Sequence, residues 1–109
     1  MTFTHTLELT DTQRMIRDTV REFAREEIAP RARHIDETGE FPKETFKKMG
    51  ELGLMGIPIP EEYDGAGADT LTFILAIEEI SKVCGSTALG LAAHTSLGTV
   101  PILLFGSPA

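Results

Sequence analysis

Two adjacent glutamates, Glu78 and Glu79, and the histidine His94 are the side chains that suggest acid–base chemistry in this sequence. Glu78 and Glu79 could act as paired carboxylates, but neighbours on a helix point about 100° apart and cannot face one substrate together. The alternative is a solvated pair in which Glu78 contacts Lys82 four residues on. No carboxylate, Ser or Cys stands at helical spacing from His94, which favours a structural group over a catalytic relay.

A lone cysteine and a glycine-containing turn complete the candidates. Cys84 is expected at a helix end with no cation at helical spacing, a setting that does not produce a reactive thiolate. One cysteine forms no internal disulfide, and the three histidines lack ligand spacing, so no metal site is expected. Gly65-Ala66-Gly67 could cradle a phosphate, but the dinucleotide and P-loop spacings are both missing, which favours a plain loop. We assign no residue as catalytic or cofactor-binding.

Length, composition and charge limit the class of protein. A chain of 109 residues makes one domain, and 41% hydrophobic with 25% charged residues is typical of a soluble globular protein. The net charge of −7 disfavours nucleic acid as a partner, because a phosphate-binding surface needs excess positive charge. Residues 1–10 contain neither a basic segment followed by an apolar one nor an Arg-rich presequence. We therefore expect a cytoplasmic protein without a targeting segment.

The elements that would position these side chains are helices. The first is expected to begin at Thr10, whose hydroxyl forms a capping box with Gln13. Its inward face follows helical spacing at Ile16, Val20, Phe23 and Ala24. Pro30 removes a backbone hydrogen bond, so the helix is expected to end or kink near Ile28, and Gly39 stops any continuation.

A second helix is expected from Pro42 to about Leu52, with Gly53 as a left-handed cap after it. Its inward residues are predicted to be Phe46, Met49 and Gly50. The two prolines in segment 54–60 favour an extended, polyproline-like connection. Residues 64–67 are predicted to form a turn.

A third helix, capped by Asp69 and ended by Gly85, is expected to be central because it is apolar on most sides. The remaining segment, 83–109, contains no formal charge. Its glycines and proline favour a buried helical hairpin, with helices at about 87–97 and 101–105, over a membrane span. The predicted fold is all-α: a small bundle of about five helices with one extended Pro-rich connection.

Several short motifs follow one another along the chain. They are Glu22-Phe23-Ala24, Ile28-Ala29-Pro30, Phe41-Pro42, Met49-Gly50-Glu51-Leu52-Gly53-Leu54-Met55-Gly56, Pro60-Glu61-Glu62-Tyr63, Glu78-Glu79-Ile80-Ser81, His94-Thr95-Ser96-Leu97-Gly98, Pro101-Ile102 and Phe105-Gly106. In order and spacing these motifs resemble the amino-terminal domain of the acyl-CoA dehydrogenases, and the resemblance covers nearly all of the chain. One departure is Asp64, where that family often has glycine, an exchange that a surface turn tolerates.

The resemblance implies a flavoenzyme of three parts. Residues 1–109 would be its amino-terminal helical domain, which in the family precedes a middle β-barrel-like domain and a carboxy-terminal four-helix bundle in a homotetramer. The implied activity belongs to fatty acid metabolism: an oxidoreductase converts acyl-CoA to trans-2-enoyl-CoA with FAD, and an electron-transfer flavoprotein reoxidises the flavin. In the family the catalytic carboxylate and nearly all flavin contacts come from the two later domains, which this chain lacks. The isolated chain is therefore expected to be inactive and to bind no flavin.

The helix expected at 87–97 is similar to the family helix that forms one wall of the acyl pocket. The similarity implies substrate contacts at Leu89, Gly90, Ala93, His94 and Leu97. An apolar helix with small residues suits both an alkyl chain and close helix packing. Two alternatives stay open: an acyl-CoA oxidase or flavin monooxygenase that shares the domain, or a non-enzymatic helical module that binds a partner or a lipid.

Overall fold

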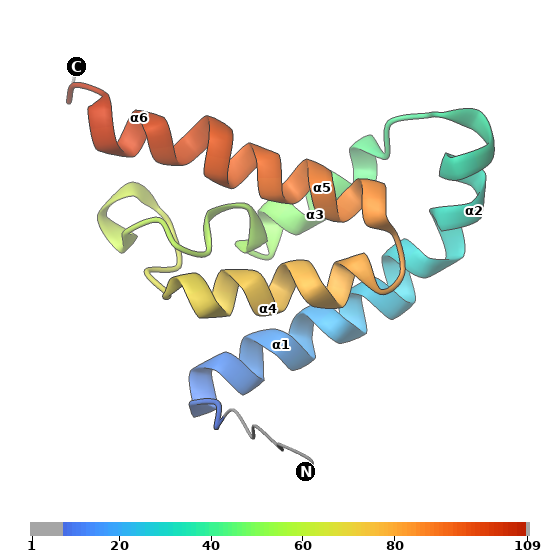
Figure 1. The fold of residues 1–109 in the computed structure, drawn as a ribbon, viewed down its shortest axis with the longest axis horizontal. Coiled ribbons are helices and arrows are strands. Elements are labelled where there is room, and N and C mark those ends of the chain that lie inside the picture. Colours follow the sequence, from blue (N-terminus) through green and yellow to red (C-terminus); the bar gives the residue numbers. More distant parts are fainter. Residues whose placement is uncertain (1–7, 109) are drawn as a thin grey trace, which may run out of the picture.

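The computed structural model describes residues 8–108, and every regular element among them is a helix, as the all-α prediction requires. The chain begins with α1 (Asp11–Phe23), which continues through a π turn, η1 (Ala24–Ile28), into α2 (Ala29–Thr38). Next come α3 (Lys43–Glu51) and two 3-10 turns, η2 (Leu54–Gly56) and η3 (Glu61–Tyr63). After α4 (Thr70–Ser81), a last long helix consists of α5 (Gly85–Ala93), the π turn η4 (His94–Thr99) and α6 (Val100–Phe105), as Figure 1 shows.

The start of α1 forms as its sequence predicts. The backbone N–H of Gln13 donates to the Thr10 hydroxyl at 3.1 Å, and the N–H of Thr10 donates to the Gln13 side chain at 2.9 Å, which completes the capping box. Gln13 is also buried, and its amide donates to the carboxylate of Asp69 at 3.0 Å. Asp69 in turn caps α4 through the N–H of Thr72. The two helix starts are therefore tied together.

Pro30 lies inside a continuous helix because a π turn precedes it. The N–H of Ala29 donates to the carbonyl of Ala24, five residues back, and the helix resumes as α2 with Pro30 in its first turn. The wide turn shifts the hydrogen-bond pattern before Pro30, so the α-helical bonds of α2 begin without a donor from the proline. The distortion predicted near Ile28 is thus a π turn rather than an end, and Gly39, with φ of 70°, stops the helix as predicted.

The region of α3 and the Pro-rich connection differs in detail from the prediction. Pro42 is the N-cap of α3 rather than its first residue. Met49 is buried as predicted, but the second buried residue of α3 is Thr45, whereas Gly50, predicted to face inward, is exposed. Segment 54–60 is not extended, because it turns through η2. That turn buries Leu54, Ile57 and Ile59, so the burial of apolar side chains outweighs the extended preference of the prolines.

The charge-free segment also differs, because it forms one long helix rather than a hairpin. α4 ends at Ser81, and Gly85 begins α5 instead of ending α4. The helix passes Pro101 as α1 passes Pro30: in the π turn η4 the N–H of Val100 donates to Thr95 O, so Pro101 falls in the first turn of α6. The glycines and the proline therefore do not divide it.

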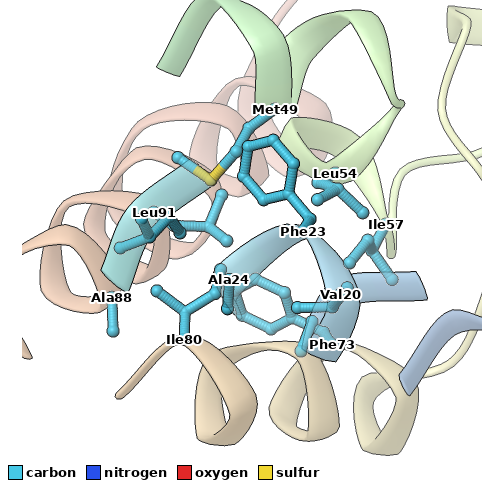
Figure 2. Packing of buried hydrophobic residues seen from close by; sticks show 12 residues of the cluster. Val20, Phe23, Ala24, Met49, Leu54, Ile57, Phe73, Ile80, Ala88 and Leu91 are labelled. Carbon is cyan, nitrogen blue, oxygen red and sulfur yellow. The ribbon is translucent and has the colours of Figure 1, made fainter. Parts of the chain in front are cut away.

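The core lies where three helices meet. α4 packs on α1 and on α5, which confirms that it is central. Figure 2 shows the cluster that α3 and η2 complete, made of Val20, Phe23, Ala24, Ile28, Met49, Leu54, Ile57, Phe73, Ala76, Ile80, Ala88 and Leu91. The domain measures 45 × 42 × 23 Å, so its thin dimension holds about two helix layers. In a domain this thin, each outer helix packs on the core with one side and leaves its other side uncovered.

Candidate functional site

The continuous helix Gly85–Phe105, called the 85–105 helix below, has one side on the core and one in the open. Ala88, Leu91 and Thr95 face the core and are buried. Large apolar side chains that do not face the core are mostly exposed: Leu89 by 70%, Leu97 by 76%, Ile102 by 71%, Leu104 by 65% and Phe105 by 86%. Apolar surface concentrated in this way marks a binding face.

The five residues predicted to contact an acyl chain all lie on this helix. Leu89, Ala93 and Leu97 are spaced by four residues and therefore follow one line along it. Leu89 and Leu97 are exposed and Ala93 is half-buried between them, so the structure brings these three together. His94 is exposed at the start of the π turn. Gly90 is half-buried and faces α3 instead.

Gly90 allows the 85–105 helix to approach α3 closely. A Cβ at this position would lie 2.7 Å from Phe46 Cζ, closer than any ordinary contact. Phe46 itself stacks on Phe41, with the ring centroids 5.0 Å apart. A cleft of about 320 Å³ borders this contact and reaches from α2 to Gly90. The contact of Gly90 with the ring of Phe46 is thus the first of two contacts that fix the 85–105 helix against the rest of the domain, and these contacts are called anchors below.

Thr95 provides a second anchor at the π turn. Its side chain is 0% exposed, and its hydroxyl donates to the Met55 carbonyl of η2 at 3.0 Å. Within the turn, the hydroxyl of Thr99 donates to the carbonyl of His94 at 3.2 Å. The segment that carries His94 and Leu97 is therefore fixed from the core side by a buried polar contact.

The 85–105 helix is 21 residues long and, judged by length and composition alone, apolar enough to cross a membrane. The glycines and the proline were expected to interrupt this stretch, and that expectation is wrong, because the helix is unbroken. A mostly buried core helix of a soluble protein meets the same criterion, but 17% of the apolar part of this helix is buried. In this fold Ala88, Leu91 and Thr95 pack within the chain itself, so the apolar character has a structural explanation on one side.

Glu79 is a structural carboxylate rather than half of an acid–base pair. Arg21 donates to it twice, from Nε at 3.1 Å and from Nη2 at 2.9 Å, and Lys82 donates at 3.1 Å. The hydrogen bond from Arg21 is the main cause that lowers the pKa of Glu79, against an opposing effect of burial. Glu78 is exposed and lies 3.8 Å from Lys82, as predicted. Glu79 therefore joins α1 to α4 as an ion.

Cys84 caps the start of α5 rather than ending α4. Burial raises the pKa of its thiol, but hydrogen bonds from the side chains and backbone of Ser86 and Thr87 outweigh burial, and the pKa falls below its ordinary value. The closer of the two hydroxyls, that of Thr87, lies 3.1 Å from the sulfur. Across residues 8–108, no group of three His, Cys, Asp or Glu side chains could hold a metal ion.

The glycine turn is not built to hold phosphate. Its backbone N–H groups are already used: Gly65 donates to Pro60, Ala66 to Gly56 and Gly67 to Ile59, at 3.1, 2.9 and 2.8 Å. A phosphate cradle needs such donors free. The turn therefore offers no site for the diphosphate of a flavin nucleotide, and this part of the chain does not fit that cofactor.

Asp64, which precedes this turn, has a φ of 64°. Aspartate tolerates the left-handed region better than most residues, and the side chain is exposed. The substitution of glycine by aspartate is therefore compatible with the turn.

Two contacts of the 85–105 helix were not predicted from sequence. Thr95 could have been identified, because it continues the core-facing positions of Ala88 and Leu91 at spacings of three and four. A polar residue on that face must find a buried partner. The contact of Gly90 with Phe46 could not have been identified from the sequence, because α3 and α5 are distant along the chain and only the tertiary fold brings them together.

Comparison with known proteins gives a consistent result along the chain. Residues 10–109 match the family described as "Acyl-CoA dehydrogenase, N-terminal domain". The chain is 61% identical over 100 residues to "Probable acyl-CoA dehydrogenase YngJ" of Bacillus subtilis (strain 168), covering 92% of this chain and 26% of the relative. It is 57% identical over 89 residues to "Acyl-CoA dehydrogenase, short-chain specific" of Clostridium acetobutylicum, covering 82% and 24%. The chain thus spans about a quarter of these relatives.

Solved structures show the same fold. Butyryl-CoA dehydrogenase from Megasphaera elsdenii matches with a TM-score of 0.87 and 33% identity, over 94% of this chain and 28% of that one. A chain in the structure described as "Electron transferring flavoprotein of Acidaminococcus fermentans: Towards a mechanism of flavin-based electron bifurcation" matches with a TM-score of 0.89 and 43% identity, over 94% and 27%. An acyl-CoA dehydrogenase complexed with FAD from Bacillus anthracis matches with a TM-score of 0.84 and 34% identity, over 93% of this chain and 17% of that one.

Proposed function

Because this chain belongs to the acyl-CoA dehydrogenase family, whose amino-terminal domain it matches over residues 10–109, we propose that it forms one wall of the acyl pocket in an FAD-dependent enzyme. The proposed enzyme oxidises acyl-CoA thioesters to trans-2-enoyl-CoA. The open side of the 85–105 helix is the observation that carries this proposal, because it presents uncharged, apolar side chains along a helix anchored to a core. A rigid apolar surface suits an alkyl chain.

Of the five expected residues, Leu89, Ala93, His94 and Leu97 are proposed to contact the acyl chain, whereas Gly90 faces α3 and is proposed to position the helix. Leu89 and Leu97 supply exposed apolar surface, and the small, half-buried Ala93 lies between them. Gly90 brings the helix close to Phe46 and so sets the depth at which the wall lies. His94 adds a polar edge at the π turn.

FAD and the base that takes the α-proton are proposed to come from the part of the protein that this chain does not contain. FAD supplies the two-electron oxidation of the acyl group when bound there. The closed glycine turn supports this division, since its donors are used within the chain. A match to an FAD-complexed acyl-CoA dehydrogenase supports the choice of cofactor.

Further properties of the whole enzyme belong to the same proposal. Its relatives include a short-chain specific acyl-CoA dehydrogenase and a butyryl-CoA dehydrogenase, which favours a short acyl substrate. The match in an electron transferring flavoprotein structure supports such a protein as the electron acceptor. We place the enzyme in the cytoplasm, as a homotetramer of three-domain subunits that acts in fatty acid metabolism.

The test is turnover by the full-length protein with butyryl-CoA, octanoyl-CoA and palmitoyl-CoA and an artificial electron acceptor. We expect the matching trans-2-enoyl-CoA as product and the highest kcat/KM for butyryl-CoA. Hydrogen peroxide formed from O₂ without the acceptor would instead indicate an oxidase, and an oxygenated product would indicate a monooxygenase. Absence of turnover with every acyl-CoA, by protein that retains its flavin, would contradict the proposal.

A further inference from the structure

Thr95 lies at the point where the 85–105 helix meets η2. It is the residue of the π turn that is completely buried, and it makes two contacts of different kinds. Its side-chain hydroxyl donates to the carbonyl of Met55, and its own carbonyl accepts the N–H of Val100 that closes the wide turn. Thr95 therefore connects the geometry of the π turn to a fixed element outside the helix.

We propose that Thr95 is a positioning residue for acyl-chain binding, because its hydrogen bond to Met55 fixes the π turn that carries His94 and Leu97. This inference rests on the proposed function. Thr95 itself points into the core and cannot touch a substrate on the open side, so it acts through the backbone.

The exposed wall residues need such an anchor because their own surroundings do not fix them. Leu97 is 76% exposed and His94 is exposed, so few protein atoms hold their side chains. The backbone position of η4 therefore decides where both side chains lie. Towards α5, Gly90 is seated on Phe46, but that contact is more than one helical turn from Leu97. Thr95 is the anchor nearest to the wall residues in the turn.

Thr95→Val in the full-length enzyme tests the proposal, because valine keeps the shape and removes the hydroxyl. Thr95→Ser keeps the hydroxyl and loses only a methyl group. The matched control is Thr87→Val: Thr87 is equally buried on the same helix, but its hydroxyl contacts only Cys84 within its own turn. KM and kcat are measured with butyryl-CoA and octanoyl-CoA for the wild type and all three variants.

We expect Thr95→Val to raise KM about three- to tenfold with kcat within about twofold, as loss of ground-state binding does. The effect should be larger for octanoyl-CoA, which contacts more of the wall. Thr95→Ser should restore KM to within about twofold of the wild type, and Thr87→Val should leave it unchanged. Hydrogen exchange read by mass spectrometry should be faster in peptide 94–100 of Thr95→Val alone.

Two results would overturn the inference. One is an unchanged KM in Thr95→Val together with unchanged exchange in peptide 94–100. The other is an equal rise in KM in Thr95→Val and Thr87→Val, which would show a general loss of helix stability. Failure of the proposed function is distinguishable from both, because the wild-type enzyme would then turn over no acyl-CoA.

Discussion

Gly65→Ala should severely destabilise the domain, because the backbone of the glycine turn lies directly against Ile59. A Cβ at Gly65 would be 2.0 Å from the Ile59 carbonyl oxygen and 2.4 Å from its carbon. Ordinary C···O contacts are about 3.3 Å or longer, so the backbone at Gly65 and the backbone at Ile59 must move apart by roughly 1 Å. The clash involves backbone on both sides, and no side-chain rotation relieves it.

The magnitude follows from what this separation breaks. The loop is closed by N–H groups of residues 65–68, which donate to carbonyls of residues 56–60. Two or three lost bonds at about 1 kcal/mol each, with partial exposure of Ile57 and Ile59, give a loss of about 2–4 kcal/mol in the free energy of unfolding. With an m-value of about 1–2 kcal/mol/M for a small domain, the urea midpoint should fall by more than about 1 M.

The assay is urea unfolding of the 109-residue chain followed by far-UV circular dichroism at low protein concentration. Gly56→Ala is the matched control in the same loop, because its Cβ would lie 3.5 Å from the nearest atom, an ordinary contact. We expect Gly56→Ala to move the midpoint by less than about 0.5 M. Equal midpoints for the two variants would refute the steric reasoning.

Four further predictions concern the wall, the ion pair and the isolated chain. In the full-length enzyme, Ala93→Leu adds three carbons between Leu89 and Leu97 and should lower kcat/KM for octanoyl-CoA roughly tenfold, with little change for butyryl-CoA, as measured by an acyl-CoA series. The pKa of Glu79 is lowered in the fold, so its stabilising contribution is present above its ordinary pKa of 4.5 and is lost as pH falls through the lower folded value. Unfolding followed between pH 6 and about 3 should therefore show a fall in stability that Glu79→Gln reduces. The 109-residue chain should self-associate through the 85–105 helix, and light scattering should show smaller particles for a Leu97→Lys/Phe105→Lys variant. The purified chain should carry no flavin absorbance after gel filtration.

Each of these predictions has an opposite result. A uniform loss of activity at every acyl length would make Ala93 a packing residue, and no change at any length would contradict its place in the pocket. A pH profile identical in wild type and Glu79→Gln would mean that other carboxylates govern acid unfolding. A strictly monomeric chain with a protected 85–105 helix would show that its open side needs no cover. A yellow, stoichiometric chromophore would contradict the division of the flavin site.

Local signals predicted the starts of α1 and α4 correctly. The capping box of Thr10 and the cap of Asp69 depend on side chains that bond within three residues, so sequence alone contains the information. The left-handed glycines Gly39 and Gly53 are likewise local. The inward face of α1 was predicted because an apolar stripe must meet a core wherever that core lies.

The errors arose where tertiary packing overrides local preference. Prolines and glycines in segments 54–60 and 85–105 predict interruptions, yet burial of Leu54 and Ile57 turns one segment and packing on α4 holds the other straight. The partner of Glu79 was missed because Arg21 lies on a different helix, and single-sequence spacing shows contacts only within one helix. Site residues were placed by family resemblance, since an exposed apolar helix alone does not state what covers it.

The two π turns change the phase of the helices that contain them. A π turn spans five residues where an α turn spans four, so each one acts as a single-residue insertion that rotates everything after it by about 100°. A helical wheel drawn without a break across η4 therefore assigns the residues of α6 to the wrong side, and the same holds for α2 after η1. Deleting one residue from η4 would restore the ordinary phase, but it would place a carbonyl against the ring of Pro101. Pro101 and the π turn before it therefore depend on each other, and the turn cannot become α-helical while the proline is present.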